Sequence, residues 1–205
     1  MKIFKDRKSA GKLLANHLKQ YKGQNNVVVL GIPRGGVVVA HQVAKELKLP
    51  LDIVITRKIG HPNQPELAVG AIDPDGEVVW DQELDNGLKI GVLEELREIK
   101  RREEIYRQGR KSIDLEDKTI ILVDDGIATG ATITAAISYL KRHKVKNIVL
   151  ATPVASKEAI VRVLAELEGC GEVVILETPE YFQAVGQFYH EVLPISDEEV
   201  IQLLS

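Results

Sequence analysis

The stretch Ile120–Thr132, with the sequence IILVDDGIATGAT, decides the fold of this chain. It opens with four apolar residues, three of them β-branched, which is the pattern of a strand buried on both faces. Asp124 and Asp125 follow where that strand ends, and a short turn leads into a helix that opens at Thr129. Ligands of open α/β sheets bind at the carboxyl ends of the strands, so we expect a ligand here. The N–H groups that start the helix favour a phosphate, and the two acids favour hydroxyl groups or a divalent metal.

This stretch resembles the motif with which type I phosphoribosyltransferases bind phosphoribosyl pyrophosphate (PRPP): an apolar strand, two acids, a small loop and T-G-x-T. The resemblance implies that Asp124 and Asp125 hold the ribose hydroxyls, directly or through Mg²⁺. It also implies that the loop binds the 5-phosphate through Gly126, Ile127, Ala128, Thr129, Gly130, Ala131 and Thr132. The alternative is an ordinary buried strand whose acids cap the next helix, but a cap accounts for only one acid.

A second strand, loop and helix are expected around GIPRGG at 31–36, after the apolar run Val27–Leu30. The loop lacks the spacing of the Walker and dinucleotide-binding motifs. By its residues it is either an anion loop, in which the guanidinium of Arg34 suits phosphate, or a tight turn with an exposed arginine. Its position resembles that of the pyrophosphate loop of the same family, which implies that the Pro33–Arg34 peptide is cis. The residues that this resemblance assigns to pyrophosphate are Pro33, Arg34, Gly35 and Gly36.

A basic pair, Arg57 and Lys58, follows the expected strand Leu51–Thr56. The next residues, IGHPNQPE at 59–66, predict a mobile loop because they hold Gly, Pro and Asn without periodicity. Relatives carry a flexible lid in this region, so the resemblance implies that the pair stabilises the departing pyrophosphate. A solvated basic pair is the alternative. Two short strands, 67–72 and 77–80, predict a β-hairpin.

Aromatic residues gather in 177–193, after the last expected core strand. In the family this region forms a hood over the acceptor base, which implies base contacts from Phe182 and Val185. Simple packing at the end of the domain is an equally good interpretation. Ala128 is a departure, because hypoxanthine–guanine enzymes carry an Asp just before the T-G pair. The alanine at position 128 argues against a 6-oxopurine acceptor and leaves the acceptor unassigned.

The alternation of short apolar strands with helices predicts an α/β fold with a central, mostly parallel sheet flanked by helices. We expect one domain over 1–205, with a small hood built from the terminal segments and a β-hairpin lid. The formal charge of −3 gives no general attraction to nucleic acid or to anionic membranes. The charged helix expected at 91–111 interleaves acids and bases and has a thin apolar stripe of Val92, Leu96, Ile99 and Tyr106, which predicts a solvated helix packed by one edge. The alternatives are a homodimer contact and, less favoured because of the interleaved glutamates, an RNA groove.

The sequence has one cysteine, Cys170, so an intrachain disulfide is impossible and a reducing cytoplasm is expected. No apolar run approaches the roughly 20 residues of a membrane span. Taken together, these observations predict a cytoplasmic, Mg²⁺-dependent phosphoribosyltransferase that uses PRPP and a small acceptor. The alternatives are a regulator that senses PRPP without turnover and a hydrolase that uses the acid pair as metal ligands.

Overall fold

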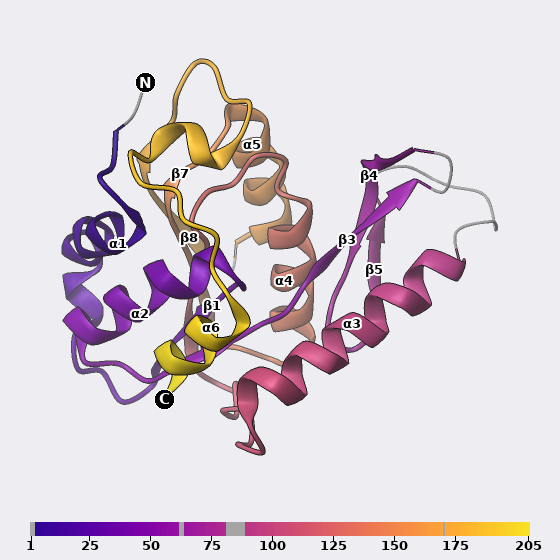
Figure 1. Ribbon diagram of the computed structural model, residues 1–205. Helices are drawn as coiled ribbons and strands as arrows, with labels where there is room; N and C mark the ends of the chain where they lie inside the picture. The colour runs from indigo at the N-terminus through magenta and orange to yellow at the C-terminus, as the bar shows by residue number, and fades with distance from the viewer. Residues whose placement is uncertain (1–2, 62–63, 81–88, 170) are drawn as a thin grey trace.

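The computed structural model describes residues 3–61, 64–80, 89–169 and 171–205, so Cys170 lies outside the described residues. Its helices and strands alternate along most of the chain, as the sequence predicts (Figure 1). In chain order they are α1 (Arg7–Asn16), η1 (Lys19–Tyr21), β1 (Val27–Gly31), α2 (Gly35–Leu47), β2 (Leu51–Ile53), β3 (Arg57–His61), β4 (Gln64–Ile72), β5 (Val78–Trp80), α3 (Lys89–Arg107), β6 (Thr119–Val123), α4 (Ala131–Arg142), β7 (Asn147–Val154), α5 (Lys157–Leu167), β8 (Gly171–Glu177), η3 (Val185–Phe188) and α6 (Asp197–Leu204).

The main sheet is parallel and has the strand order β2-β1-β6-β7-β8. Strands β1 and β6 pair in register from Val27 opposite Thr119 to Gly31 opposite Val123. Both strands therefore end at the same level of the sheet. The loops that follow them, the glycine-rich loop and the acid pair, leave the sheet side by side, which confirms the predicted α/β fold and places the two motifs together.

Helices cover both faces of this sheet (Figure 1). Alternate residues of β6 point in opposite directions: Ile120 and Leu122 pack with α4 and α5, whereas Ile121 and Val123 pack with α1 and α2. All four side chains have no exposed surface. Complete burial on both faces explains why β6 is continuously apolar instead of alternating between apolar and polar residues.

A second sheet, antiparallel and of order β3-β4-β5, stands to one side of the main sheet, with α3 packed along it (Figure 1). The hairpin of β4 and β5 confirms the prediction for 67–80. The loop predicted over 59–66 is wrong for its described residues, because β3 and β4 pair there; residues 62 and 63 lie outside the described residues. The pairing shifts register around Gly60, and such an irregularity hides the period-2 pattern of a strand.

The small sheet shares a core with α3 and with the C-terminal helix α6. Ile59 of β3 packs there with Ile99 and Tyr106 of α3, and each is fully buried. These two α3 residues belong to the apolar stripe expected along the charged helix. None of the helices in the described part of the chain is long and apolar enough to cross a membrane.

The N-terminal segment pairs with the chain that precedes the C-terminal helix α6. The backbone N–H groups of Ile3 and Phe4 both donate to the carbonyl of Phe188 at 2.9 Å, and His190 N–H donates to the carbonyl of Phe4 at 2.9 Å. Phe4, Phe188 and Tyr189 are buried together with Val154 at the end of β7. We call residues 3–6 and 182–193 the hood segment, and their pairing agrees with the predicted hood of terminal segments.

Candidate functional site at the carboxyl edge of the parallel sheet

The acid pair directly follows β6 and is fixed by the loop around it. Asp125 N–H donates to Asp124 Oδ1 at 2.8 Å, so the first carboxylate folds over the backbone of the second residue. Ile127 N–H donates to the carbonyl of Val154 and its own carbonyl accepts from Ser156 N–H, both at 2.9 Å. Ser156 Oγ also donates to the carbonyl of Ala128 at 2.6 Å. These three hydrogen bonds attach the loop to the end of β7 and to Ser156 at the start of α5.

Beyond this attachment the loop opens into α4. Gly130 has a left-handed backbone, with φ of 80°, and its carbonyl accepts both the N–H and the hydroxyl of Thr134. Helix α4 then begins at Ala131 with no side-chain cap from Gly130. Thr129 is exposed and Thr132 is half-buried at this edge. The first N–H groups of α4 therefore need a partner from outside the helix, which suits an anion.

The glycine-rich loop lies against the acid pair. The Pro33–Arg34 peptide is cis, which confirms that prediction. A Cβ atom added to Gly36 would lie 2.8 Å from Asp124 Oδ1, and one added to Gly35 would overlap the carboxylate of Asp125. These glycines are required because no side chain fits between the two loops. Two motifs that are 88 residues apart in sequence (36 and 124) thus form one surface.

Asp124 is an acid of the site whose pKa is shifted by its surroundings. Burial raises the pKa of its carboxyl well above the usual range, and the charge of Asp125 raises the pKa further. The positive charge of Lys58 lowers the same pKa, so Lys58 lies within electrostatic reach of the acid pair. A cation brought next to Asp124 would therefore favour its ionised form.

The two residues of the predicted basic pair, Arg57 and Lys58, have different surroundings. Arg57 Nε contacts Glu95 Oε2 of α3 at 2.5 Å, which commits Arg57 to the packing of the small sheet. Lys58 is exposed beside it and acts on Asp124 as described above. The structure therefore brings Lys58 to the site and shows a structural partner for Arg57.

Arg34 points toward the C-terminal helix. Its Nη1 lies 3.7 Å from Asp197 Oδ1 at the start of α6, and 45% of its side chain is exposed. The same Asp197 oxygen accepts the hydroxyl of Tyr106 at 2.6 Å. An exposed ion pair at this distance is weak, so Arg34 can exchange Asp197 for another anion.

The two predicted base contacts have different surroundings. Val185 lies beside the acid-pair loop, because a Cβ atom on Gly126 would be 2.6 Å from Val185 Cγ1. Phe182 is half-buried, and its ring centroid is 4.8 Å from that of Phe188. Phe182 therefore has a packing role within the hood segment, whereas Val185 borders the candidate site directly.

Arg7 is a site residue that none of the sequence motifs indicates. Its Nε donates to Asp125 Oδ2 at 2.6 Å, and only 15% of the Arg7 side chain is exposed. The hydroxyl of Tyr189 donates to the carbonyl of Asp125, also at 2.6 Å. The available signal was the short segment DRKS, in which Asp6 and Ser9 cap α1 and leave Arg7 as its first residue.

The carboxylates can hold a metal only with help from a ligand. No group of three or more His, Cys, Asp or Glu side chains suited to a metal occurs among the residues that the structure describes. Asp124 and Asp125 both keep part of their surface open at the sheet edge. Two oxygens of this kind suit Mg²⁺, which keeps several water or phosphate ligands and needs few from the protein.

Comparison with known proteins identifies the family of this chain. Residues 4–183 match the family model described as phosphoribosyl transferase domain. A predicted phosphoribosyl transferase of Mycobacterium tuberculosis is 44% identical over 211 residues, which cover 100% of this chain and 47% of that protein. The chain thus spans about half the length of this relative. A uracil phosphoribosyltransferase of Finegoldia magna is 47% identical over 47 residues, covering 23% of this chain and 22% of that enzyme. The crystal structure of the protein TT1426 from Thermus thermophilus matches with a TM-score of 0.83 and 40% identity, covering 100% of this chain and 98% of that one.

Proposed function

Because the chain belongs to the phosphoribosyl transferase domain family, we propose that it transfers the phosphoribosyl group of PRPP to a nucleobase or another small acceptor. The observation that carries the proposal is the contact of Gly35 and Gly36 with Asp124 and Asp125. This contact supports the proposal because PRPP joins pyrophosphate directly to the ribose, so the loops proposed to bind these two groups must be neighbours. An isolated pair of helix-capping acids would not need a glycine-rich loop packed against it.

The reaction breaks the bond between the anomeric carbon and pyrophosphate and forms a bond from that carbon to the acceptor. Positive charge develops on the ribosyl ring while negative charge develops on pyrophosphate. The protein must therefore position the donor and stabilise the leaving group, and it needs no nucleophile of its own. Mg²⁺, held by Asp124, Asp125 and the oxygens of PRPP, would offset the charge of the departing pyrophosphate.

Each part of the site has a role in this scheme. Asp124 and Asp125 bind the ribose hydroxyls, and the 126–132 loop binds the 5-phosphate through the N–H groups at the start of α4. Gly35, Gly36 and Arg34 bind pyrophosphate, for which Arg34 leaves Asp197. Lys58 adds positive charge beside Asp124. Val185 borders the acceptor, and Ala128 supplies no acid for proton transfer to a 6-oxopurine.

The test is pyrophosphate release from PRPP in the presence of Mg²⁺ and a panel of bases. We expect release that depends on one class of acceptor, and we expect Asp124→Asn and Asp125→Asn to lower kcat/KM by about 10- to 150-fold, since a hydrogen bond to a charged group contributes about 1.5–3 kcal/mol. Asp114→Asn is the matched control, because Asp114 is exposed and precedes β6, at the end of that strand opposite the acid pair. Tight PRPP binding without release for any acceptor would instead favour a PRPP-sensing regulator.

A further inference from the structure

Arg7 links three separate parts of the molecule. Its Nε donates to Asp125 Oδ2 at 2.6 Å, and its Nη1 donates to the carbonyl of Leu193 at 3.1 Å. Its guanidinium carbon lies 5.7 Å from the centre of the Tyr189 ring. One side chain on α1 thus contacts an acid of the proposed ribose site and two residues of the hood segment. A planar guanidinium can make these contacts together, whereas an ammonium group cannot.

The position of Arg7 is set by the local sequence. The Asp6 carboxylate accepts the Ser9 N–H at 2.6 Å, and the Ser9 hydroxyl lies 3.1 Å from the Asp6 N–H that donates to it. This capping box begins α1 at Arg7 and fixes the direction in which its side chain leaves the helix. Arg7 therefore reaches Asp125 from a rigid helix end instead of from a flexible terminus.

Asp125 in turn lies directly beneath the glycine-rich loop. The space where a Gly35 Cβ would lie is taken by the Asp125 carboxylate, and Arg7 Nε would be 3.0 Å from the same Cβ. The carboxylate is therefore enclosed by Gly35 on one side and Arg7 on another. Without Arg7, two neighbouring acids would share this partly buried edge with less positive charge to offset them, and Asp125 could rotate away from the loop.

We propose that Arg7 is the positioning residue of the PRPP site, which fixes the Asp125 carboxylate against the glycine-rich loop and transmits the placement of the hood segment to it. This inference rests on the proposed function and assigns a role that the family motif does not contain. Arg7 acts through Asp125 and does not touch the reacting atoms. Its loss should weaken PRPP binding, because Asp125 would no longer be held in the orientation that the ribose hydroxyls require.

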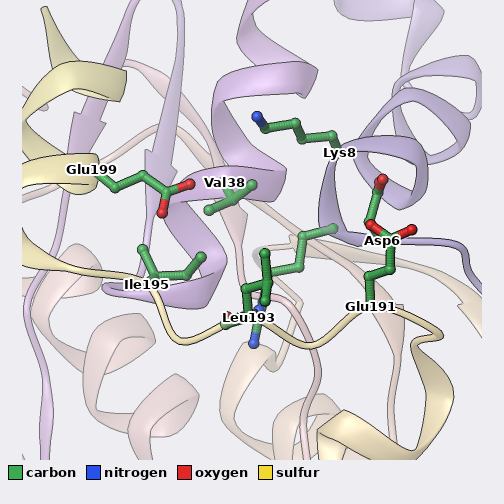
Figure 2. A pocket seen from close by; sticks show the side chains of 8 residues that line it. Asp6, Lys8, Val38, Glu191, Leu193, Ile195 and Glu199 are labelled. Carbon is green, nitrogen blue, oxygen red and sulfur yellow. Dashed lines mark hydrogen bonds between the residues drawn. The ribbon is translucent and has the colours of Figure 1, made fainter.

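A pocket beside Arg7 makes a specific test possible. It has a volume of about 150 Å³ and lies between the start of α1, α2 and the residues that lead into α6 (Figure 2). Arg7 lines the pocket together with Asp6, Lys8, Val38, Glu191, Leu193, Ile195 and Glu199. Truncation of Arg7 to alanine would extend this space toward Asp125, so a small guanidinium ion from solution could take the place of the missing group.

The experiment measures PRPP affinity by calorimetry with Mg²⁺ for the wild-type protein, Arg7→Ala, Arg7→Gln and Lys8→Gln. We expect both Arg7 variants to bind PRPP about 10- to 100-fold more weakly, in line with the loss of a charge-assisted contact. Guanidinium at millimolar concentration should restore binding several-fold in Arg7→Ala, whereas sodium at equal ionic strength should not. Lys8→Gln removes an exposed charge from the same helix turn and should bind PRPP as the wild-type protein does.

A double-mutant cycle identifies the path of the effect. If Arg7 acts through Asp125, Arg7→Gln should add little to the loss caused by Asp125→Asn. Wild-type PRPP affinity in Arg7→Gln, or losses that add fully in the double variant, would overturn the inference while leaving the proposed function intact. If Arg7→Ala does not fold, Arg7→Gln and the cycle still decide. Failure of the wild-type protein to bind PRPP would overturn both the proposed function and this inference.

Discussion

Replacement of Gly36 by alanine perturbs the contact between the glycine-rich loop and the acid pair with a single methyl group. The new Cβ would lie 2.8 Å from Asp124 Oδ1 and 2.9 Å from both Asp124 Cα and Val123 O. Ordinary contacts of a Cβ begin at 3.4 Å, so the two loops would separate by about half an ångström. Two of the three crowded atoms belong to the backbone, which cannot rotate out of the way.

The expected stability change is the balance of two effects. Alanine within a helix stabilises the folded state relative to glycine by up to about 1 kcal/mol. Overpacking costs about 1–3 kcal/mol, and it outweighs the helix term here because the backbone must move. We therefore expect a net loss of about 1–2 kcal/mol, which lowers Tm by about 2–8 °C for a chain of this size. Displacement of Asp124 should also weaken PRPP binding by about 10-fold or more.

Gly91 provides the matched control for this substitution. It lies in the first turn of α3, and among the residues that the structure describes a Cβ added there would meet only Ile59 Cγ2, at 3.8 Å. Gly91→Ala should keep or raise Tm and leave PRPP affinity unchanged. Thermal unfolding followed by circular dichroism and calorimetric titration with PRPP and Mg²⁺ measure both quantities. Wild-type PRPP affinity in Gly36→Ala would refute the idea that the two loops form one binding surface.

Substitutions at Asp124, Asp197 and Gly126 test further contacts of the same site. Burial raises the pKa of Asp124 in the folded state, so the free energy of unfolding falls as pH rises from about 4 through that raised pKa. Asp124→Asn removes the buried acid and should therefore raise Tm at pH 8, by an amount that shrinks toward pH 4. The gain in the free energy of unfolding at pH 8 should be about 1.4 kcal/mol for each unit by which folding raises the pKa. Asp197→Asn removes the weak ion pair with Arg34 and should tighten pyrophosphate binding about 2- to 5-fold in a titration, the range of an exposed pair. Gly126→Ala should lower Tm because its Cβ would lie 2.6 Å from Val185 Cγ1 and 3.0 Å from Val154 Cγ1, and Val185→Ala in the same chain should restore part of the loss.

The sequence predicts those parts of the site whose residues are contiguous in the chain. The acid pair and the 126–132 loop follow β6 directly, and a strand buried on both faces has a distinctive apolar composition. The glycine-rich loop follows β1 in the same manner. Parallel neighbours end at the same edge of a sheet, so general rules suffice to predict that these loops meet.

The small sheet shows where local patterns mislead. Residues 59–66 contain Gly and Pro, yet their described part forms strands, because an antiparallel partner and a register shift at Gly60 accommodate the irregular backbone. In the sequence Arg57 likewise resembles an exposed basic residue, but in the fold it lies opposite α3 and forms an ion pair with Glu95. Tertiary contacts decide both outcomes, and no short window of sequence contains them.

The acceptor part of the proposed site is harder to predict from sequence than the donor part, for the same reason. The proposed donor site consists of two strand–loop–helix units, and each unit can be predicted from its own stretch of sequence. The hood segment is assembled from residues 3–6 and 182–193, and Arg7 reaches Asp125 across 118 positions of sequence. With the acceptor held by the hood segment as proposed, we expect acceptor preference to change through substitutions in either part of that segment, without alteration of the PRPP motif. Because Arg7 and Tyr189 both contact Asp125, such substitutions would still affect donor binding, and acceptor preference and PRPP affinity should change together in variants of the hood segment.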